Sequence, residues 1–346
     1  MDETAPIPGI DVDPVTDWFV ANVPGATPPL SFELIAGGRS NLTYRVTDTP
    51  GGTWVLRRPP TGHVLATAHD MVREHRIISA LAATDVPVAP AIGLCEDEAV
   101  NGAPFYVMGY VDGLVLRDAG QASLVTPEVR RRAGLSVAEN LARIHAVDPD
   151  AVGLGDLGRK DGYIERQLKR WNGQFDKART RDVPSVSSAH DRLLTAIPTQ
   201  GAPAIVHGDY RLDNCMVDAS GEVITVLDWE ICTLGDPLAD LGVLMVYWTE
   251  PDDPYAALPG AATVLEGFPS RAEMVAAYEA AGGRSVGDLD YYVGFGYWKL
   301  ACILEGVFTR YKAGAMGNDG ADADAFGSMV DLLGQASLAA LDKIGS

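Results

Sequence analysis

The feature that most constrains this chain is the run His207-Gly208-Asp209, with an asparagine and a second aspartate at set distances after it. Asn214 comes five residues after Asp209, and Asp228 comes fourteen residues after Asn214. This order and spacing are typical of a phosphoryl-transfer site. In such a site the first aspartate accepts the proton of a substrate hydroxyl. The asparagine and the second aspartate hold the metal ions that bridge the phosphates of ATP.

The residues before Asp228 predict that it lies at the end of a buried strand. An apolar run precedes it, made of Val223, Ile224, Val226 and Leu227. A short apolar run of this kind favours a strand in the protein interior. The simpler alternative for the first motif is that His207 and Asp209 only order a turn.

Two departures separate these motifs from those of protein kinases, which have H-R-D followed by Asn, and then D-F-G. Here Gly208 stands in place of the arginine, and Asp228-Trp229-Glu230 stands in place of D-F-G. H-G-D-x-x-x-x-N followed by D-x-E resembles the aminoglycoside phosphotransferase and choline kinase superfamily, small-molecule kinases of protein-kinase-like fold. The resemblance implies ATP and Mg²⁺ as cofactors, and a small molecule with a hydroxyl group as the acceptor.

The hydrophobic pattern changes from strands to helices along the chain. In the first part, strand-like segments lie at residues 32–35, 42–46, 54–57, 91–94 and 104–108. One helical segment, at residues 71–82, lies between the third and fourth of them. Helical segments are predicted at 13–23, 127–146, 164–175 and 189–197. We therefore expect an α+β, two-lobed fold with a small lobe of five antiparallel strands plus a helix. The expected parts are a nucleotide-binding lobe at 1–108, a hinge at 109–113 and a mainly helical lobe at 114–346 with the catalytic loop and acceptor site.

The segment between the first two predicted strands fits a loop that covers phosphates. Its glycines permit close approach of the backbone, and its amide groups and Ser40 can donate hydrogen bonds. The nucleotide-binding candidates here are Gly38, Arg39, Ser40 and Asn41. Without the other motifs, an ordinary hairpin turn would explain the segment equally well.

The strand at residues 54–57 places Val55 and Arg57 on one face, because side chains alternate along a strand. In the kinase V-A-I-K strand, these two positions hold a small residue over adenine and a lysine on the phosphates. Arg57 is permanently charged and can bind a phosphate and a carboxylate at once, and Glu74 is its predicted partner. Arginine in place of lysine also leaves open a nucleotide-binding pseudokinase. If the register shifts by one residue, Arg58 takes this role.

Residues 105–113 resemble the hinge of the same superfamily, an apolar strand that runs into Asp-Gly. By this resemblance Met108 flanks the adenine pocket, and the Gly109 carbonyl and the Val111 amide bind the adenine edge. Further along, Asp236 and Asp240 are predicted to be structural, capping a helix and bracing the catalytic loop.

Longer strings resemble one branch of the superfamily, the kinase-like domain associated with acyl-CoA dehydrogenases. They lie at residues 38–44, 55–60, 69–74, 207–214 and 227–230. The branch implies a hydroxyacyl-CoA or a related metabolite as the acceptor, and the alternative is an aminoglycoside. Arg166 and Arg170, four residues apart on a predicted helix, are candidates for binding an anionic acceptor. A solvated basic face would explain them as well.

The composition of the chain limits the classes of binding partner that we expect. The formal net charge of −20 disfavours nucleic acid and anionic membrane surfaces. The four cysteines form no C-x-x-C pair, and the acidic start has no basic signal region, which together predict a cytoplasmic protein. The apolar stretch at residues 291–311 is interrupted by three charged residues, so we expect a buried helix there rather than a membrane span.

Overall fold

The computed structural model describes residues 7–36, 41–61, 69–253, 261–287, 289–314 and 322–344. The chain forms two compact units. The first unit contains residues 1–114 together with 224–230, and the second contains 115–223 and 231–346. The segment that carries Asp228 therefore belongs to the first unit, although it lies more than a hundred residues further along the chain.

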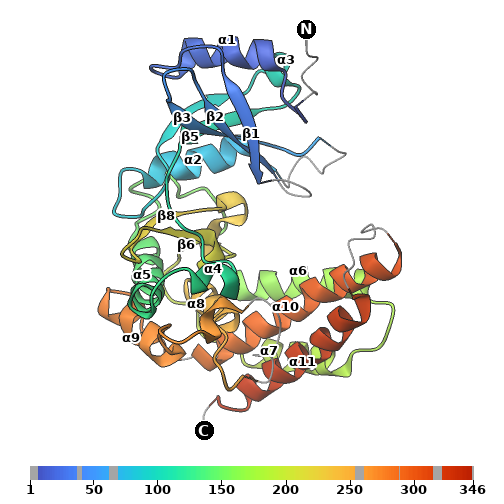
Figure 1. The fold of residues 1–346 in the computed structure, drawn as a ribbon. Coiled ribbons are helices and arrows are strands. Elements are labelled where there is room, and N and C mark those ends of the chain that lie inside the picture. The colour runs from blue at the N-terminus through green and yellow to red at the C-terminus, as the bar shows by residue number, and fades with distance from the viewer. Residues whose placement is uncertain are drawn as a thin grey trace. The chain divides into compact units, whose positions relative to one another are not determined.

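The first unit is built on a five-stranded antiparallel sheet with the strand order β1-β2-β3-β5-β4 (Figure 1). Its strands are β1 (Ser31–Ala36), β2 (Leu42–Thr47), β3 (Thr53–Arg58), β4 (Ala91–Cys95) and β5 (Phe105–Gly109). All five predicted strands are present, and each predicted boundary lies within a residue or two of the observed one. The expected α+β class is confirmed.

Two longer helices cover opposite faces of this sheet, and α3 (Glu98–Asn101) is a single short turn. Phe19 of α1 (Val12–Asn22) packs in one apolar core with Tyr44 and Leu56 of the sheet. The side chain of Arg57 points to the other face, where α2 (Met71–Leu81) lies. Strand alternation thus separates an apolar face from a face that carries charge.

The second unit is mainly helical. Its long helices are α5 (Pro127–Ala146), α6 (Tyr163–Ala178), α7 (Pro184–Thr195), α8 (Leu238–Tyr247), α9 (Arg271–Ala280), α10 (Leu289–Lys312) and α11 (Ala323–Leu341). Its shorter elements are α4 (Ala119–Ser123), β6 (Ala204–Val206), β7 (Cys215–Val217) and β9 (Thr233–Gly235); β8 (Val223–Val226) connects the two units in the chain. Buried residues of α6, α7, α10 and α11 form one apolar core.

The helix predicted at 189–197 is misplaced, because α7 begins at Pro184 and ends at Thr195. Proline suits the first helical position, where its missing N–H has no partner to lose. The predicted boundaries of α5 agree with the structure at both ends, where Thr126 caps the helix and Pro127 starts it.

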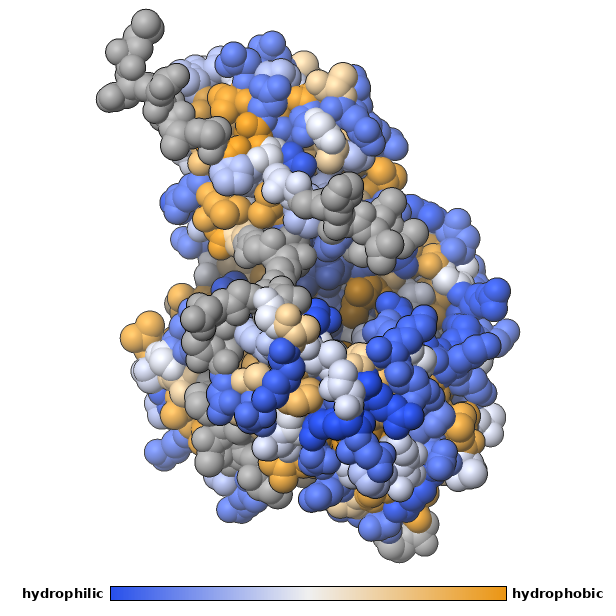
Figure 2. All heavy atoms as spheres, turned by 90° about the vertical axis from the view of Figure 1, so that its right-hand side faces the viewer, coloured by the Kyte–Doolittle hydropathy of each residue, from blue (hydrophilic) through white to orange (hydrophobic). Residues whose placement is uncertain are grey.

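The apolar stretch at 291–311 forms most of α10, whose buried residues include Phe295 and Trp298. Within the described ranges we find no helix with the length and apolar character that a membrane crossing requires. On the face shown in Figure 2, hydrophilic side chains predominate and apolar ones occur in small groups.

Candidate active site

Arg57 on β3 is the centre of a charged cluster in the first unit. Its Nε lies 3.1 Å from Oε1 of Glu74, and its Nη2 lies 2.6 Å from Oδ1 of Asp228. Oε2 of Glu230 is 3.8 Å from the same Nη2. The pairing of Arg57 with Glu74 that the sequence predicts is therefore present.

Arg58 does not take this place. Its side chain donates to the carbonyl oxygens of Gly9, Pro59 and Asn101, on the opposite face of the sheet. The observed register pairs Thr43 with Arg57 and Leu42 with Arg58. The alternative in which a register shift brings Arg58 to Glu74 is wrong.

Glu74 is almost fully buried, with 2% of its side chain exposed. Burial raises the pKa of its carboxyl above the ordinary value, and the neighbouring Arg57 opposes this rise. Because burial of an unpaired charge is costly, the arginine is what allows a charged Glu74 at this depth.

Arg57→Met should lower the free energy of unfolding by about 3–5 kcal/mol, because it leaves a buried carboxylate unpaired. Without Arg57, the pKa of Glu74 rises further. When the pKa of a carboxyl is higher in the folded state than in the unfolded state, its contribution to the free energy of unfolding is fully present below the ordinary glutamate pKa. This contribution is lost as the pH rises through the folded-state pKa. The variant should therefore lose stability progressively from acid to neutral pH. Urea unfolding at several pH values measures this.

The matched control is Arg57→Met combined with Glu74→Gln, which removes both charges. It should recover much of the loss and remove the added pH dependence. A single variant as stable as the parent at neutral pH would show that the ion pair does not support the fold.

Asp228 adopts a left-handed backbone conformation, with φ of 64°, the one such non-glycine residue in the described part of the chain. Aspartate and asparagine tolerate this region better than most residues, yet it is sparsely populated. The turn directs the Asp228 carboxylate toward Arg57 while about a third of its side chain remains exposed.

Asn41, the last residue of the predicted phosphate loop, is buried next to this cluster. Its Nδ2 donates to Oε2 of Glu230 at 3.2 Å, and its Oδ1 lies 2.8 Å from Nδ1 of His69. His69 lies just before α2, and the side chain of Asp70 caps the start of that helix. The other loop candidates, Gly38, Arg39 and Ser40, lie outside the described residues.

The predicted adenine-binding residues lie on β3, on β5 and directly after it. Val55 pairs with Met108 across the two strands, so their side chains lie on the same face. Gly109 ends β5, and its N–H donates to the carbonyl of Pro90 at 2.8 Å. Val111 follows two residues later.

In the second unit, Asp240 of α8 holds the backbone of the His207-Gly208-Asp209 turn. Its two carboxylate oxygens accept from the N–H groups of His207 at 2.6 Å and Gly208 at 2.8 Å. Burial alone would raise the pKa of Asp240, but His145 and these hydrogen bonds hold it below the ordinary value. Asp240 is thus a charged, buried brace for the loop, as predicted, and Asp236 accepts from the Leu238 N–H at the start of α8.

Asp209 is oriented from one side and accessible from the other. Nδ2 of Asn214 donates to the Asp209 carbonyl at 2.8 Å and to its Oδ2 at 3.1 Å. Nε of Arg211 lies 3.5 Å from the same Oδ2. About a third of the Asp209 side chain is exposed. Because Asn214 directs its amide nitrogen to Asp209, its carbonyl oxygen is the side-chain atom that could bind a metal.

A pocket of about 240 Å³ lies against Asp209 within the second unit. Its polar lining consists of Asp209, Arg211, Tyr247, Lys299 and the Trp171 indole, and its apolar lining includes Ile231, Val243, Val246, Leu300 and Ile303. Among the described lining residues, Asp209 is the one carboxylate. It shares the pocket with two cations, Arg211 and Lys299.

Lys299 is the site residue that sequence reasoning missed. Its Nζ donates to the Gly208 carbonyl at 2.8 Å and lies 5.6 Å from the centre of the Trp171 ring. Burial lowers its pKa, while Asp240 and Asp209 oppose the decrease. The one signal in the sequence was that Lys299 is one of three charged residues within the apolar stretch at 291–311.

The basic pair on α6 lies elsewhere. Arg166 donates to the carbonyl oxygens of Arg159 and Asp161, just before the helix. The guanidinium of Arg170 lies over the Trp171 ring at 5.3 Å. Neither lines the pocket at Asp209, although Arg170 lies close enough to Lys299 to contribute to the lowering of the pKa of that amine.

Comparisons with known proteins agree with this geometry. The sequence model of the phosphotransferase enzyme family (APH) matches residues 31–284. Acyl-CoA dehydrogenase family member 10 of Mus musculus is 35% identical over 306 residues, which cover 84% of this chain and 27% of that protein. Family member 11 of Gallus gallus is 34% identical, with 82% of this chain and 37% of that protein covered. The chain thus spans about a quarter to two fifths of these relatives.

Solved structures show the same fold. A crystal structure from Ralstonia eutropha JMP134, provisionally named an aminoglycoside phosphotransferase, is 34% identical with a TM-score of 0.81, and 96% of this chain and 98% of that chain are covered. Choline kinase from Cryptosporidium parvum Iowa II is 11% identical with a TM-score of 0.65, and 95% of each chain is covered, which supports the fold alone. The resemblance seen in the motifs is confirmed, and the chain belongs to the phosphotransferase enzyme family.

Proposed function

We propose that the protein transfers the γ-phosphoryl group of ATP to a hydroxyl of a small molecule, in the presence of Mg²⁺. The observation that carries the proposal is the position of Asp209, on a loop braced by the buried Asp240 and facing a pocket of about 240 Å³. A carboxylate held in this way can orient an acceptor hydroxyl and accept its proton during in-line transfer.

We assign the metal-binding and nucleotide-binding roles to the residues of the sequence motifs. Asp228 and the carbonyl oxygen of Asn214 are hard oxygen donors, the kind that Mg²⁺ prefers in combination with phosphate oxygens. The bound metal would neutralise charge on the phosphates. Arg57, held by Glu74, would position them. The nucleotide contacts are completed by Gly38, Arg39, Ser40, Asn41, Val55, Met108, Gly109 and Val111.

For the acceptor we infer an anionic or neutral hydroxylated metabolite, with a hydroxyacyl-CoA as the leading candidate. The matched relatives are named acyl-CoA dehydrogenases. The Asp209 pocket holds two cations, Arg211 and Lys299, beside the single carboxylate of Asp209, and much of its remaining lining is apolar. A polycationic aminoglycoside would meet like charges there, and like charges brought together disfavour a partner.

A nucleotide-binding protein without turnover is the second candidate. Arg57 favours it, because this side chain already binds Asp228 at 2.6 Å and would have to release that carboxylate to a metal. ATP binding with no phosphoryl transfer to any acceptor would support this candidate.

The test is ATP consumption with a panel of aminoglycosides, choline, homoserine-like alcohols, hydroxy acids and hydroxyacyl-CoA thioesters. We expect turnover with the anionic or neutral acceptors and none with aminoglycosides. Lys299→Met should raise KM for the anionic acceptor about tenfold with little change for ATP, since it removes a charge-assisted contact of roughly 1.5 kcal/mol. Lys169→Met, an exposed lysine on α6, is the control. Efficient turnover of an aminoglycoside alone would overturn the acceptor assignment and leave the kinase assignment standing.

A further inference from the structure

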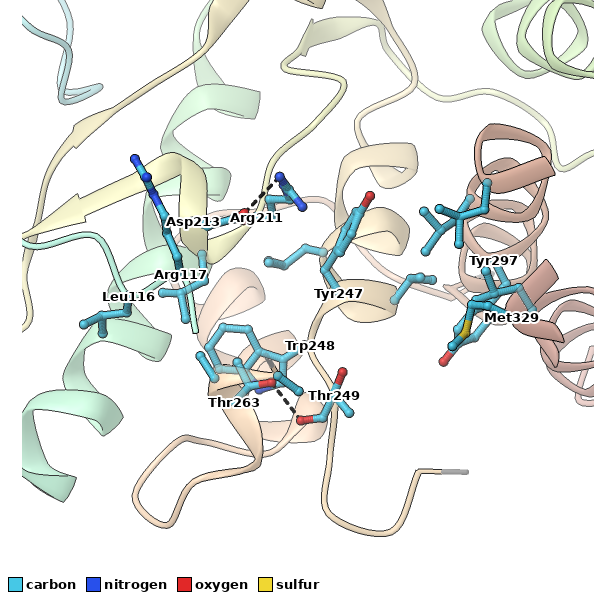
Figure 3. Close-up of a pocket in the computed structure, with 18 residues that line it drawn as sticks. Leu116, Arg117, Arg211, Asp213, Tyr247, Trp248, Thr249, Thr263, Tyr297 and Met329 are labelled. Atoms are coloured by element: carbon cyan, nitrogen blue, oxygen red, sulfur yellow. Dashed lines mark hydrogen bonds and ion pairs between the residues drawn. The ribbon is translucent and has the colours of Figure 1, made fainter. Parts of the chain in front are cut away.

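A second cavity lies beside the Asp209 pocket in the helical unit (Figure 3). It has a volume of about 460 Å³, within the range of roughly 300–1,000 Å³ common for ligand pockets. The two cavities share walls formed by Arg211, Val246, Tyr247 and Leu300. A molecule that extends from Asp209 into the larger cavity would pass between these side chains.

The larger cavity is polar at one side and apolar at the other. Arg117, Arg211 and Asp213 lie on one side in Figure 3, and Tyr297 and Met329 lie on the other, with Tyr247 in between. The apolar side is extended by Leu300, Leu304 and Leu333. Such a gradient suits an amphiphile, whose polar part stays near the arginines while its chain enters the apolar side.

Two further polar groups in the wall of the larger cavity are bonded within the protein. Nε1 of Trp248 donates to the Pro269 carbonyl at 2.8 Å, and the Thr263 hydroxyl donates to the Thr249 carbonyl at 2.8 Å. Asp213, the one carboxylate among the described lining residues, pairs with Arg211 at 2.9 Å. An apolar chain can thus lie against these groups without leaving any of the three unpaired, whereas a polycation would find no free carboxylate.

We propose that this cavity binds the apolar chain of the acceptor whose hydroxyl lies at Asp209. This inference rests on the proposed function and adds a subsite to it. It makes the acceptor an amphiphile with a straight aliphatic chain, and it makes chain length a determinant of specificity. Each methylene that enters the cavity should raise kcat/KM about fourfold, the equivalent of ~0.8 kcal/mol per buried CH₂ group.

The activity test uses straight-chain hydroxyacyl-CoA thioesters of increasing length with the hydroxyl position unchanged. We expect kcat/KM to rise with chain length until the cavity is full. Met329→Trp should lower kcat/KM for the long-chain acceptors about tenfold or more. It should leave kcat/KM for the shortest acceptor unchanged. Leu332→Trp is the matched control, because Leu332 lies on the same helix but is 40% exposed.

A binding test needs neither turnover nor a cavity variant. The protein is labelled with ¹³C at the methionine methyl groups, and Met329→Leu serves only to assign the Met329 signal. Addition of a straight-chain hydroxy acid of about ten carbons should shift the Met329 signal, and the four-carbon homologue should not.

The outcomes separate the two proposals. Transfer that is independent of chain length, or an unmoved Met329 signal with the long hydroxy acid, would overturn the cavity assignment while the phosphotransferase proposal stands. A shifted Met329 signal without ATP consumption by any acceptor would support the cavity and contradict the proposed function.

Discussion

Asp209→Asn should lower phosphoryl transfer by about a hundredfold or more and leave ATP affinity nearly unchanged. Asparagine has nearly the same shape, and its carbonyl oxygen can still accept from Nδ2 of Asn214, which now lies 3.1 Å from Oδ2 of Asp209. The loop should keep its conformation because its brace, Asp240, is untouched. What is lost is the ability to accept a proton. Single-turnover transfer and calorimetric ATP binding, measured side by side, check the prediction.

The matched control is Asp191→Asn, a change of the same kind at an aspartate whose side chain is 83% exposed on α7. It should behave as the parent protein in both measurements. If Asp209→Asn lost ATP affinity while transfer per bound ATP stayed unchanged, the residue would be a structural part of the turn.

Asp228→Ala should abolish Mg²⁺-dependent ATP binding or turnover, because the proposed metal site would lose an anionic ligand. Alanine also disfavours the left-handed conformation at φ of 64°. Asp228→Asn is therefore the sharper variant, since asparagine tolerates this conformation and removes only the charge. Both variants should reduce Mg²⁺-dependent turnover to background. Titration of Mg²⁺ at constant ATP, followed by calorimetry, measures the binding part.

The free energy of unfolding of the Asp228→Asn variant distinguishes a metal-binding role of Asp228 from a structural one. Asp228→Asn removes one partner of Arg57, but Glu74 remains, so the free energy of unfolding should change by only about 1 kcal/mol. A variant that binds Mg-ATP as tightly as the parent and keeps its turnover would show that Asp228 is not a metal ligand. A large loss of stability would indicate that the carboxylate mainly holds Arg57.

Local patterns in the sequence predicted much of the fold. The two-residue alternation on β3 put Arg57 and Leu56 on opposite faces, and the structure has the charged pair on one face and the apolar core on the other. Capping chemistry at Thr126 and Pro127 set the start of α5. The braces Asp236 and Asp240 were also predicted. The strand alternation and the helix start depend on neighbouring residues, so a single sequence is enough to read them. Asp240 contacts a turn 33 residues away, and its role was predicted together with the family resemblance.

Tertiary structure decided the features that depend on residues far apart in the chain. Lys299 looked like an interruption of an apolar helix, and only the packing of α10 brings its amine to the Gly208 carbonyl, 91 residues away. Likewise, Asp228 contacts Arg57 because residues 224–230 join the first unit. The two neighbouring cavities arise where residues from several helices meet. The sequence by itself determined the family and the motif residues through local spacing. The lining of the pocket at Asp209 was decided by long-range packing, which no local pattern encodes.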